Sequence, residues 1–146
     1  MDARHEARQR WMSVLARATA AELQGGAAYL PGYVRLRGPE AGLVMVQGRA
    51  GGTGEAFNLG EATVVRCSVR TAAGMVGHST CLGRDLRQAE LAAALDAALQ
   101  DPDAAPAIMA DVVEPLAAAQ AERRAQEARR AAATQVQFYT LAAMRS

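Results

Sequence analysis

The sequence predicts an α+β domain, and three observations carry that prediction. Apolar residues near the start recur at steps of three and four, which is typical of an amphipathic helix. Ala62 to Arg70 alternate in polarity, as a strand with one buried face does. From Gly83 the period returns to that of a helix. With 146 residues, the chain is long enough for one domain spanning residues 1–146.

The expected architecture is an antiparallel, hairpin-built sheet between helices. The expected elements are, in order, a helix over Arg4–Leu23, a connection over Gln24–Gly42 with a short strand near Tyr33–Leu36, strands over Leu43–Arg49, Ala62–Arg70 and Val76–Gly83, a helix from Asp85 to about Gln100, a long helix after Pro115, and a last strand over Val136–Thr140. Asp85 is the expected N-cap of the middle helix, and Gln88 is placed to complete a capping box. Leu91, Leu95 and Leu99 should face inward from that helix.

The long helix carries a continuous stripe of methyl groups. Its members are Ala118, Ala121, Ala125, Ala128 and Ala132. Such a stripe allows another backbone to approach closely. Two interpretations are open: the helix packs on its own sheet, which is favoured, or it contacts a partner chain.

Composition and charge exclude several classes of protein. The formal net charge is +1, so nucleic acid and anionic membrane surfaces are not expected partners. No apolar run approaches the roughly 20 residues of a membrane span, and the charged start does not read as a secretory signal. Cys67 and Cys81 make no disulfide framework, which favours a reducing compartment and a soluble, cytoplasmic protein. The abundant alanine predicts a thin core that is completed against a partner.

A glycine-rich stretch, "GRAGGTGEAF", resembles a phosphate-binding loop at first reading. The chain has no lysine, all 16 basic residues are arginine, and this stretch opens no helix, so it is not a P-loop. The stretch also lacks the third glycine of a dinucleotide-binding fingerprint, which would stand three residues after the second. A plain connection between strands is slightly favoured over a loop that contacts a phosphate-bearing ligand or a partner chain. The candidate residues for the second role are Arg49, Gly51, Gly52, Thr53, Gly54 and Glu55.

A second candidate group lies on the predicted hairpin. If Ser68 pairs opposite His78, then Arg66, Ser68, Arg70 and His78 share one face that could bind a polyphosphate or a phosphonate. A merely solvated face is favoured, and a register slip of one residue would disperse the group.

The sequence gives weak support for an anion site at a helix start, and none for a metal site or a catalytic residue. Arg84 and Asp85 could meet an anion at a helix start, although capping alone accounts for Asp85. No metal site is expected, because His78 and Cys81 leave opposite faces of one strand. No catalytic residue can be assigned.

Four segments together resemble one protein family. They are "RQRWMSVLA", "GRAGGTGEAFNLGEATVVRCSVR", "GHSTCLGRDLRQAELAAALDAAL" and "VQFYT", in this order. They are similar to PhnG, a subunit of the bacterial carbon–phosphorus (C–P) lyase system.

The resemblance implies a role in organic phosphonate catabolism. It implies a core complex with PhnH, PhnI and PhnJ, and joint action with PhnL. By this resemblance, PhnG, PhnH and PhnL act with PhnI to displace adenine from MgATP by an alkylphosphonate, which gives ribose 1-phosphonate 5-triphosphate. PhnI carries the nucleosidase-like activity and PhnJ breaks the C–P bond. The resemblance carries over no catalytic residue and no cofactor held by this chain alone.

Two functions of different class therefore stay open. The first is an obligate subunit that completes a neighbour's nucleotide site, as part of a multi-subunit transferase. The second is a stand-alone protein or enzyme that binds a nucleotide or another phosphate ligand. Titrating the isolated chain with ATP distinguishes them.

Overall fold

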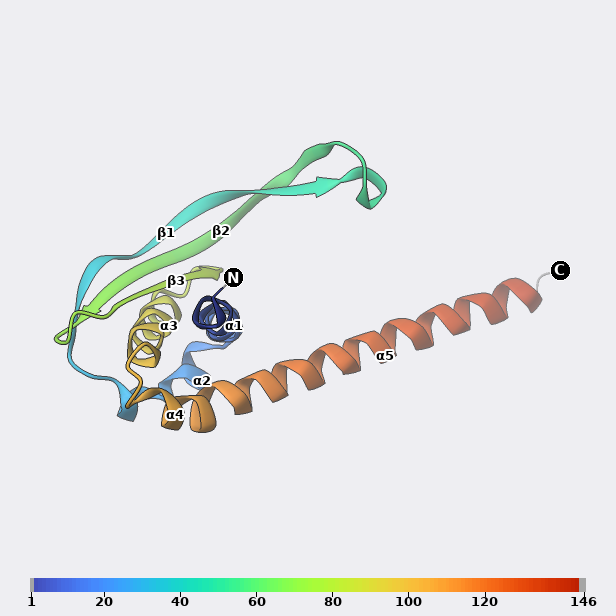
Figure 1. Cartoon of the computed structure of the whole chain (residues 1–146). Coiled ribbons are helices and arrows are strands. Elements are labelled where there is room, and N and C mark those ends of the chain that lie inside the picture. Colours follow the sequence, from blue (N-terminus) through green and yellow to red (C-terminus); the bar gives the residue numbers. More distant parts are fainter. Residues whose placement is uncertain (1, 145–146) are drawn as a thin grey trace.

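The protein is a three-stranded antiparallel sheet covered on one face by helices (Figure 1). The structure is a computed structural model that describes the backbone of residues 2–144 and the side chains of residues 2–135. The helices are α1 (Ala3–Arg17), α2 (Ala20–Gln24), α3 (Leu86–Leu99), α4 (Ala105–Ile108) and α5 (Glu114–Met144), and the strands are β1 (Tyr33–Arg49), β2 (Ala56–Thr71) and β3 (Val76–Leu82). The predicted α+β class is confirmed.

The sheet has the order β1-β2-β3, and its faces divide as the alternation predicts. Val65, Cys67 and Val69 of β2 are buried beneath the helices, whereas Arg66 and Arg70 are exposed on the other face. This division follows from the period of two along a strand. The face that carries the arginines is called the outer face below.

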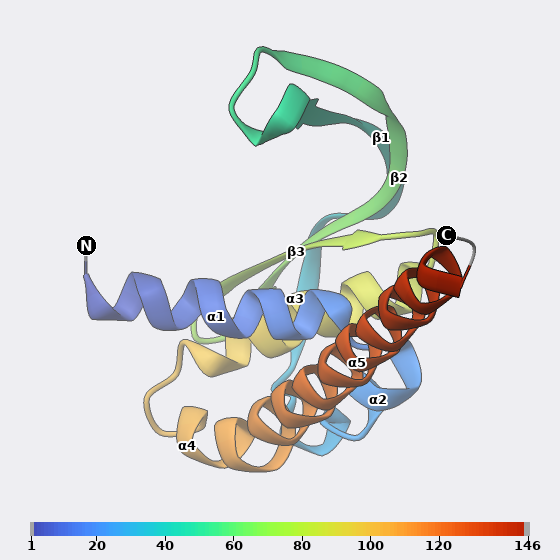
Figure 2. The ribbon, with the colours of Figure 1, turned by 90° about the vertical axis from the view of Figure 1, so that its right-hand side faces the viewer.

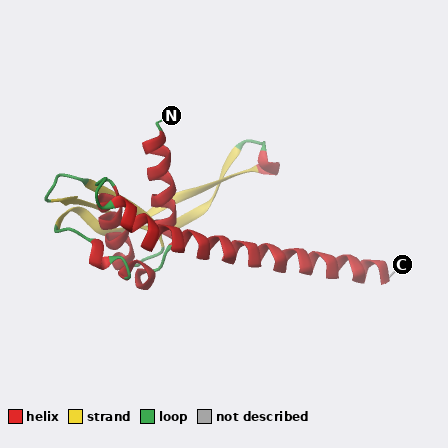
Figure 3. Cartoon of the chain, turned by 60° about the horizontal axis from the view of Figure 1, so that its bottom comes forward, coloured by secondary structure: helices red, strands yellow, loops and turns green. Residues whose placement is uncertain are grey.

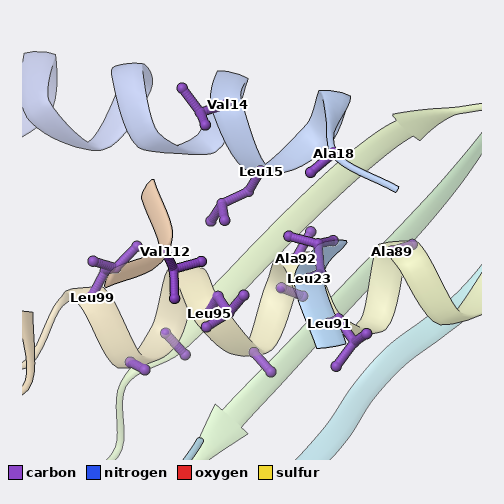
Figure 4. Close-up of a cluster of buried hydrophobic side chains, with 14 of the residues drawn as sticks. Val14, Leu15, Ala18, Leu23, Ala89, Leu91, Ala92, Leu95, Leu99 and Val112 are labelled. Carbon is purple, nitrogen blue, oxygen red and sulfur yellow. The ribbon is translucent and has the colours of Figure 1, made fainter. Parts of the chain in front are cut away.

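Helix α3 is the centre of the core. Every residue from Ala89 to Leu99 is buried, because the sheet covers one side of the helix and α1 and α2 cover the other (Figure 4). Leu91, Leu95 and Leu99 are buried as predicted. Alanine on the sheet side allows a close approach: a Cβ atom built on Gly77 of β3 would lie 2.0 Å from the carbonyl oxygen of Ala93.

The N-terminal helical segment is two helices, which corrects the expected single helix over Arg4–Leu23. Helix α1 ends at Arg17, and α2 begins after Thr19. The hydroxyl of Thr19 accepts a hydrogen bond from the Glu22 amide, and the Glu22 carboxylate accepts one from the Thr19 amide. This capping box starts a new helix in the middle of a continuous apolar pattern.

The expected last strand over Val136–Thr140 is wrong, because the backbone there continues α5 to Met144. The favoured packing of this helix on its own sheet is also wrong. Leu116 and Gln120 are buried against the body, where the Gln120 amide donates to the carbonyl of Val14 at 2.9 Å. Beyond them α5 leaves the body (Figure 3), and the side chains from Ala121 to Gln135 are exposed except for half-buried Ala125.

Candidate functional site

The most prominent surface feature is a two-stranded arm. Strand β3 ends at Leu82, which pairs with Val64, so β1 and β2 continue beyond this point without a third strand. We call residues 43–63 the hairpin arm; it rises away from the helices (Figures 1 and 2). The sequence predicted strands over Leu43–Arg49 and Ala62–Arg70. In the structure β2 begins earlier, at Ala56, and β1 begins at Tyr33, so the expected short strand near Tyr33–Leu36 is part of β1 and the expected connection is wrong for residues 37–42.

The hairpin arm exposes large apolar side chains. Leu43 is 65% exposed, Leu59 is 62% exposed, and Met45, Val46 and Phe57 are also exposed. A two-stranded ribbon offers no layer that could bury such side chains. Contiguous exposed apolar side chains are a mark of an interaction surface. The exposed apolar side chains make the arm a candidate interaction surface.

The glycine-rich stretch forms the tip of the arm. Gly51 and Gly52 have φ angles of 62° and 80°, which side chains with a Cβ rarely adopt. The amide of Gly54 donates to the carbonyl of Ala50 at 2.8 Å, and Nη1 of Arg49 reaches the carbonyl of Gly54 at 3.4 Å. The tip brings together Arg49, Gly51, Gly52, Thr53, Gly54 and Glu55, all exposed except half-buried Gly54.

The second predicted group assembles on the outer face, at the base of the arm. Ser68 pairs opposite His78, and the Ser68 hydroxyl lies 2.8 Å from Nδ1 of His78. Arg66 and Arg70 flank Ser68 on the same face and form no ion pair with the carboxylates of the described residues. This group is separated from the tip by the length of the arm (Figure 1). The two predicted groups are therefore two places and not one site.

The third predicted pair lies at the start of α3. Asp85 is the N-cap, and its carboxylate accepts from the Gln88 amide at 3.1 Å. The Gln88 side chain does not complete the expected capping box, because its Nε2 donates to the carbonyls of Ala16 and Ala18. Arg84, next to Asp85, is exposed. Asp85 thus has a structural role.

The sequence did not predict a role for two buried carboxylates of α3, those of Asp96 and Glu90. Asp96 accepts hydrogen bonds from Arg8, Trp11 Nε1 and the His78 amide. Glu90 accepts from Arg35 and from the Tyr33 hydroxyl. Both lie in an alanine- and leucine-rich helical stretch, and no local signal reveals their distant partners.

A hollow of about 560 Å³ lies between the start of α1 and the end of α3. Its lining includes His5, Arg8, Trp11 and Gln100. Arg8 in this wall is already bound to Asp96. No sequence pattern pointed to this hollow.

Burial and hydrogen bonding shift the pKa of several groups. Burial raises the pKa of the Cys81 thiol to about 11, and it raises the pKa of Cys67 as well.

His78 is exposed and Cys81 is buried, so they lie on opposite faces of β3 as predicted. Within residues 2–144, no three His, Cys, Asp or Glu side chains gather in a way that could hold a metal ion. None of the helices described is both long and apolar enough to span a bilayer.

Comparison with known proteins decides the family. The family model described as phosphonate metabolism protein PhnG matches residues 6–144. The chain belongs to the PhnG family. It is also similar to a curated protein of Rhizobium meliloti (strain 1021), the alpha-D-ribose 1-methylphosphonate 5-triphosphate synthase subunit PhnG. The two are 44% identical over 137 residues, which cover 92% of this chain and 87% of the relative. In this PhnG chain, the exposed surfaces include the hairpin arm, Arg66 and Arg70 of the outer face, and α5 beyond Gln120 as far as Gln135.

Proposed function

We propose that this chain is a subunit of alpha-D-ribose 1-methylphosphonate 5-triphosphate synthase and that it acts in phosphonate catabolism through the C–P lyase pathway. It works with PhnH, PhnI, PhnJ and PhnL rather than as a catalyst by itself. The assembly displaces adenine from MgATP by an alkylphosphonate: the bond from ribose C1′ to adenine breaks, and a bond from C1′ to a phosphonate oxygen forms. The similarity to the Rhizobium subunit supports this function. The free, buried thiols of Cys67 and Cys81 support a cytoplasmic location.

The observation that carries the proposal is the exposed apolar surface of the hairpin arm. Leu43 and Leu59 stand largely in solvent on a ribbon that has no third strand. Burying such side chains contributes about 25 cal/mol per Å² of apolar area. In the assembled synthase the arm therefore lies against a partner subunit.

A matched pair of substitutions tests the docking of the arm. Leu59→Ser removes an exposed apolar side chain from the arm, and Leu86→Ser makes the same change at an exposed leucine of the body. We expect Leu59→Ser to weaken binding to the co-expressed partner subunits about tenfold, equivalent to about 1.4 kcal/mol. Leu86→Ser should bind as the unmodified chain does. Equal binding by both variants would remove the arm from the interface.

The tip has its own test. Arg49→Ala removes the cation that reaches across the glycine turn to the carbonyl of Gly54. We propose that the tip lies at a subunit interface or beside a ligand held by a partner, so this variant should weaken assembly or the synthase reaction. Unchanged assembly together with unchanged activity would contradict this role.

The outer-face cations are proposed to lie near the phosphate groups of the substrate. Two guanidinium groups on one sheet face, at Arg66 and Arg70, suit oxygens of a triphosphate. In the assembled enzyme, Arg66→Gln with Arg70→Gln should raise the KM for MgATP and leave assembly unchanged.

The alternative is a stand-alone protein that binds a phosphate ligand through the same cations. Calorimetric titration of the isolated chain with ATP separates the two functions. We expect no tight binding; micromolar binding by an isolated monomer would favour the alternative.

A further inference from the structure

One edge of strand β3 is not paired with another strand of the described residues. Side chains bind backbone groups in only the first half of this edge. The strand pairs with β2 on one side, and no strand of the described chain pairs with its other side. The carbonyl of Val76 accepts a hydrogen bond from Gln100 Nε2 at 2.7 Å. The His78 amide donates to Oδ2 of Asp96 at 2.9 Å. In the first half of the edge, side chains of the chain therefore bind the Val76 carbonyl and the His78 amide.

The second half of this edge is open. Backbone groups that point to one edge alternate along an antiparallel strand, so Thr80 and Leu82 present their amides to the same edge as His78. Among the described residues, no hydrogen bond reaches the backbone of Thr80 or the amide of Leu82 from this side. The Leu82 side chain is 73% exposed. Unpaired edges of this kind readily accept a further strand.

A groove runs along the open half, between β3 and α1. It consists of two adjoining hollows of about 240 and 440 Å³. We call it the β3 groove. One hollow is lined by Ser13, Ala16, Arg17, Thr80, Leu82 and Gln88, and the other is lined by Met12, Ser13, Leu15, Ala16, His78, Ser79, Thr80 and Ala92. Ser13 and Ala16 line both hollows, and their small side chains leave room for another backbone. A strand paired with β3 would lie about 4.8 Å from it, in this groove.

Among the described residues that line the groove, Arg17 carries the only charge. No carboxylate is among them. Arg17 is exposed and has no ion-pair partner within the described part of the chain. Asp85, at the same end of β3, is engaged as the N-cap of α3. An occupant with a carboxylate therefore complements the groove.

We propose that the β3 groove binds an extended segment of a partner subunit, which adds a fourth strand to the sheet and sets an acidic side chain against Arg17. Unpaired amide and carbonyl groups are satisfied by extended backbone, which identifies the form of the occupant. A second copy docked through its own β3 groove would bring another Arg17 and no carboxylate from the described residues that line that groove, so charge favours a different subunit. This proposal rests on the proposed function as a subunit, and it concerns a surface separate from the hairpin arm.

Hydrogen exchange in the complex tests the added strand. The amides of Thr80 and Leu82 should exchange at least tenfold more slowly in the complex with the co-expressed partner subunits than in the isolated full chain. The His78 amide, already bound to Asp96, is the internal control and should be slow in both. Equal rates for Thr80 and Leu82 in both states would overturn the proposal while leaving the subunit function intact. Failure of the unmodified chain to assemble would overturn both.

A matched pair on α1 tests the groove. Ser13→Arg fills the groove, and Gln9→Arg makes a similar change at an exposed position of the same helix that lines neither hollow. We expect Ser13→Arg to weaken assembly about tenfold and Gln9→Arg to leave it unchanged. Arg17→Glu should weaken assembly, and Arg17→Lys should restore it. Equal assembly by the Ser13→Arg and Gln9→Arg variants would contradict the proposal.

Crosslinking identifies the occupant. A photoreactive benzoylphenylalanine in place of Thr80 should crosslink to a different subunit of the purified complex. Crosslinking to a second copy of this chain would overturn the assigned occupant.

Discussion

Nη2 of Arg8 donates a 2.8 Å hydrogen bond to Oδ2 of Asp96, whose side chain has no exposed surface. Arg8 Nε and Trp11 Nε1 bind the other oxygen at 3.2 and 2.8 Å. The same carboxylate accepts from the His78 amide of β3. One acidic side chain of α3 thereby joins α1 and the edge of the sheet.

Removing the charge of Asp96 should destabilise the fold. Asp96→Asn keeps the shape of the side chain but leaves the guanidinium of Arg8 without its counter-charge in a part-buried place. We expect the free energy of unfolding to fall by about 3 kcal/mol, measured by urea denaturation. Glu114→Gln, which breaks the exposed Arg10–Glu114 pair, is the control and should change stability little. Equal stability of the two variants would contradict this role of Asp96.

The contact between β3 and α3 predicts a severe effect at Gly77. A Cβ atom there would lie 2.0 Å from Ala93 O and 2.6 Å from Ala97 N, both backbone atoms that cannot move independently. Gly77→Ala should therefore cost about 3 kcal/mol or more of unfolding free energy, seen as a lower Tm. At Gly42 no atom lies within 4 Å of the added carbon, so Gly42→Ala should be nearly neutral. A stable Gly77→Ala variant would mean that α3 packs less closely on the sheet.

Glu90 predicts a dependence of stability on pH. Burial raises the pKa of Glu90, but hydrogen bonds from Arg35 and Tyr33 outweigh burial and hold that pKa below its ordinary value of 4.5. A carboxyl group with a lowered folded-state pKa stabilises the protein above its unfolded pKa, and that contribution disappears as the pH falls through the folded value. Urea unfolding should therefore show stability falling below about pH 4.5.

The control for this prediction is Glu90→Gln, which cannot titrate. It should lose about 1 kcal/mol at neutral pH, because Arg35 is largely exposed and its pairing is screened by water. Its stability should then change less between pH 7 and pH 3.5 than that of the unmodified chain. Parallel pH profiles would show that Glu90 has no part in the acid sensitivity.

The two thiols should be unreactive in the folded protein. Burial raises the pKa of Cys81 to about 11 and also raises that of Cys67, so the reactive thiolate is scarce at pH 8. A water-soluble disulfide reagent should modify both thiols in urea and neither under native conditions. Rapid modification of the native chain would show that β2 or β3 opens, and the Cys67→Ser variant would identify which thiol is reached.

Local sequence signals recovered the elements whose causes are local. Asp85 caps α3, and the leucines of α3 are buried, because a cap and a helical period act within a few residues. The sequence left the pairing of Ser68 with His78 as a condition, and the structure has this pairing.

Two expected elements, the strand over Val136–Thr140 and the single helix over Arg4–Leu23, are wrong because neighbouring elements compete. "VQFYT" favours a strand by composition, yet it follows a long helix. Extending a helix costs far less than starting a new element, so α5 continues through it. At Thr19 the reverse happened: a capping box interrupted a continuous apolar pattern and ended α1 early.

By itself the sequence determined the α+β class, the division of the sheet into apolar and arginine-bearing faces, and the PhnG resemblance. Only the tertiary structure decided which apolar side chains stay exposed. Leu43 and Leu59 belong to regular strands. They are exposed because β3 ends at Leu82 and no helix in the described part of the chain covers the arm (Figure 1). Likewise, the hydrogen-bond partners of Asp96 and Glu90 come from elements that are distant in the sequence. Burial and pairing depend on contacts between residues far apart in the chain, and a local pattern carries no information about them.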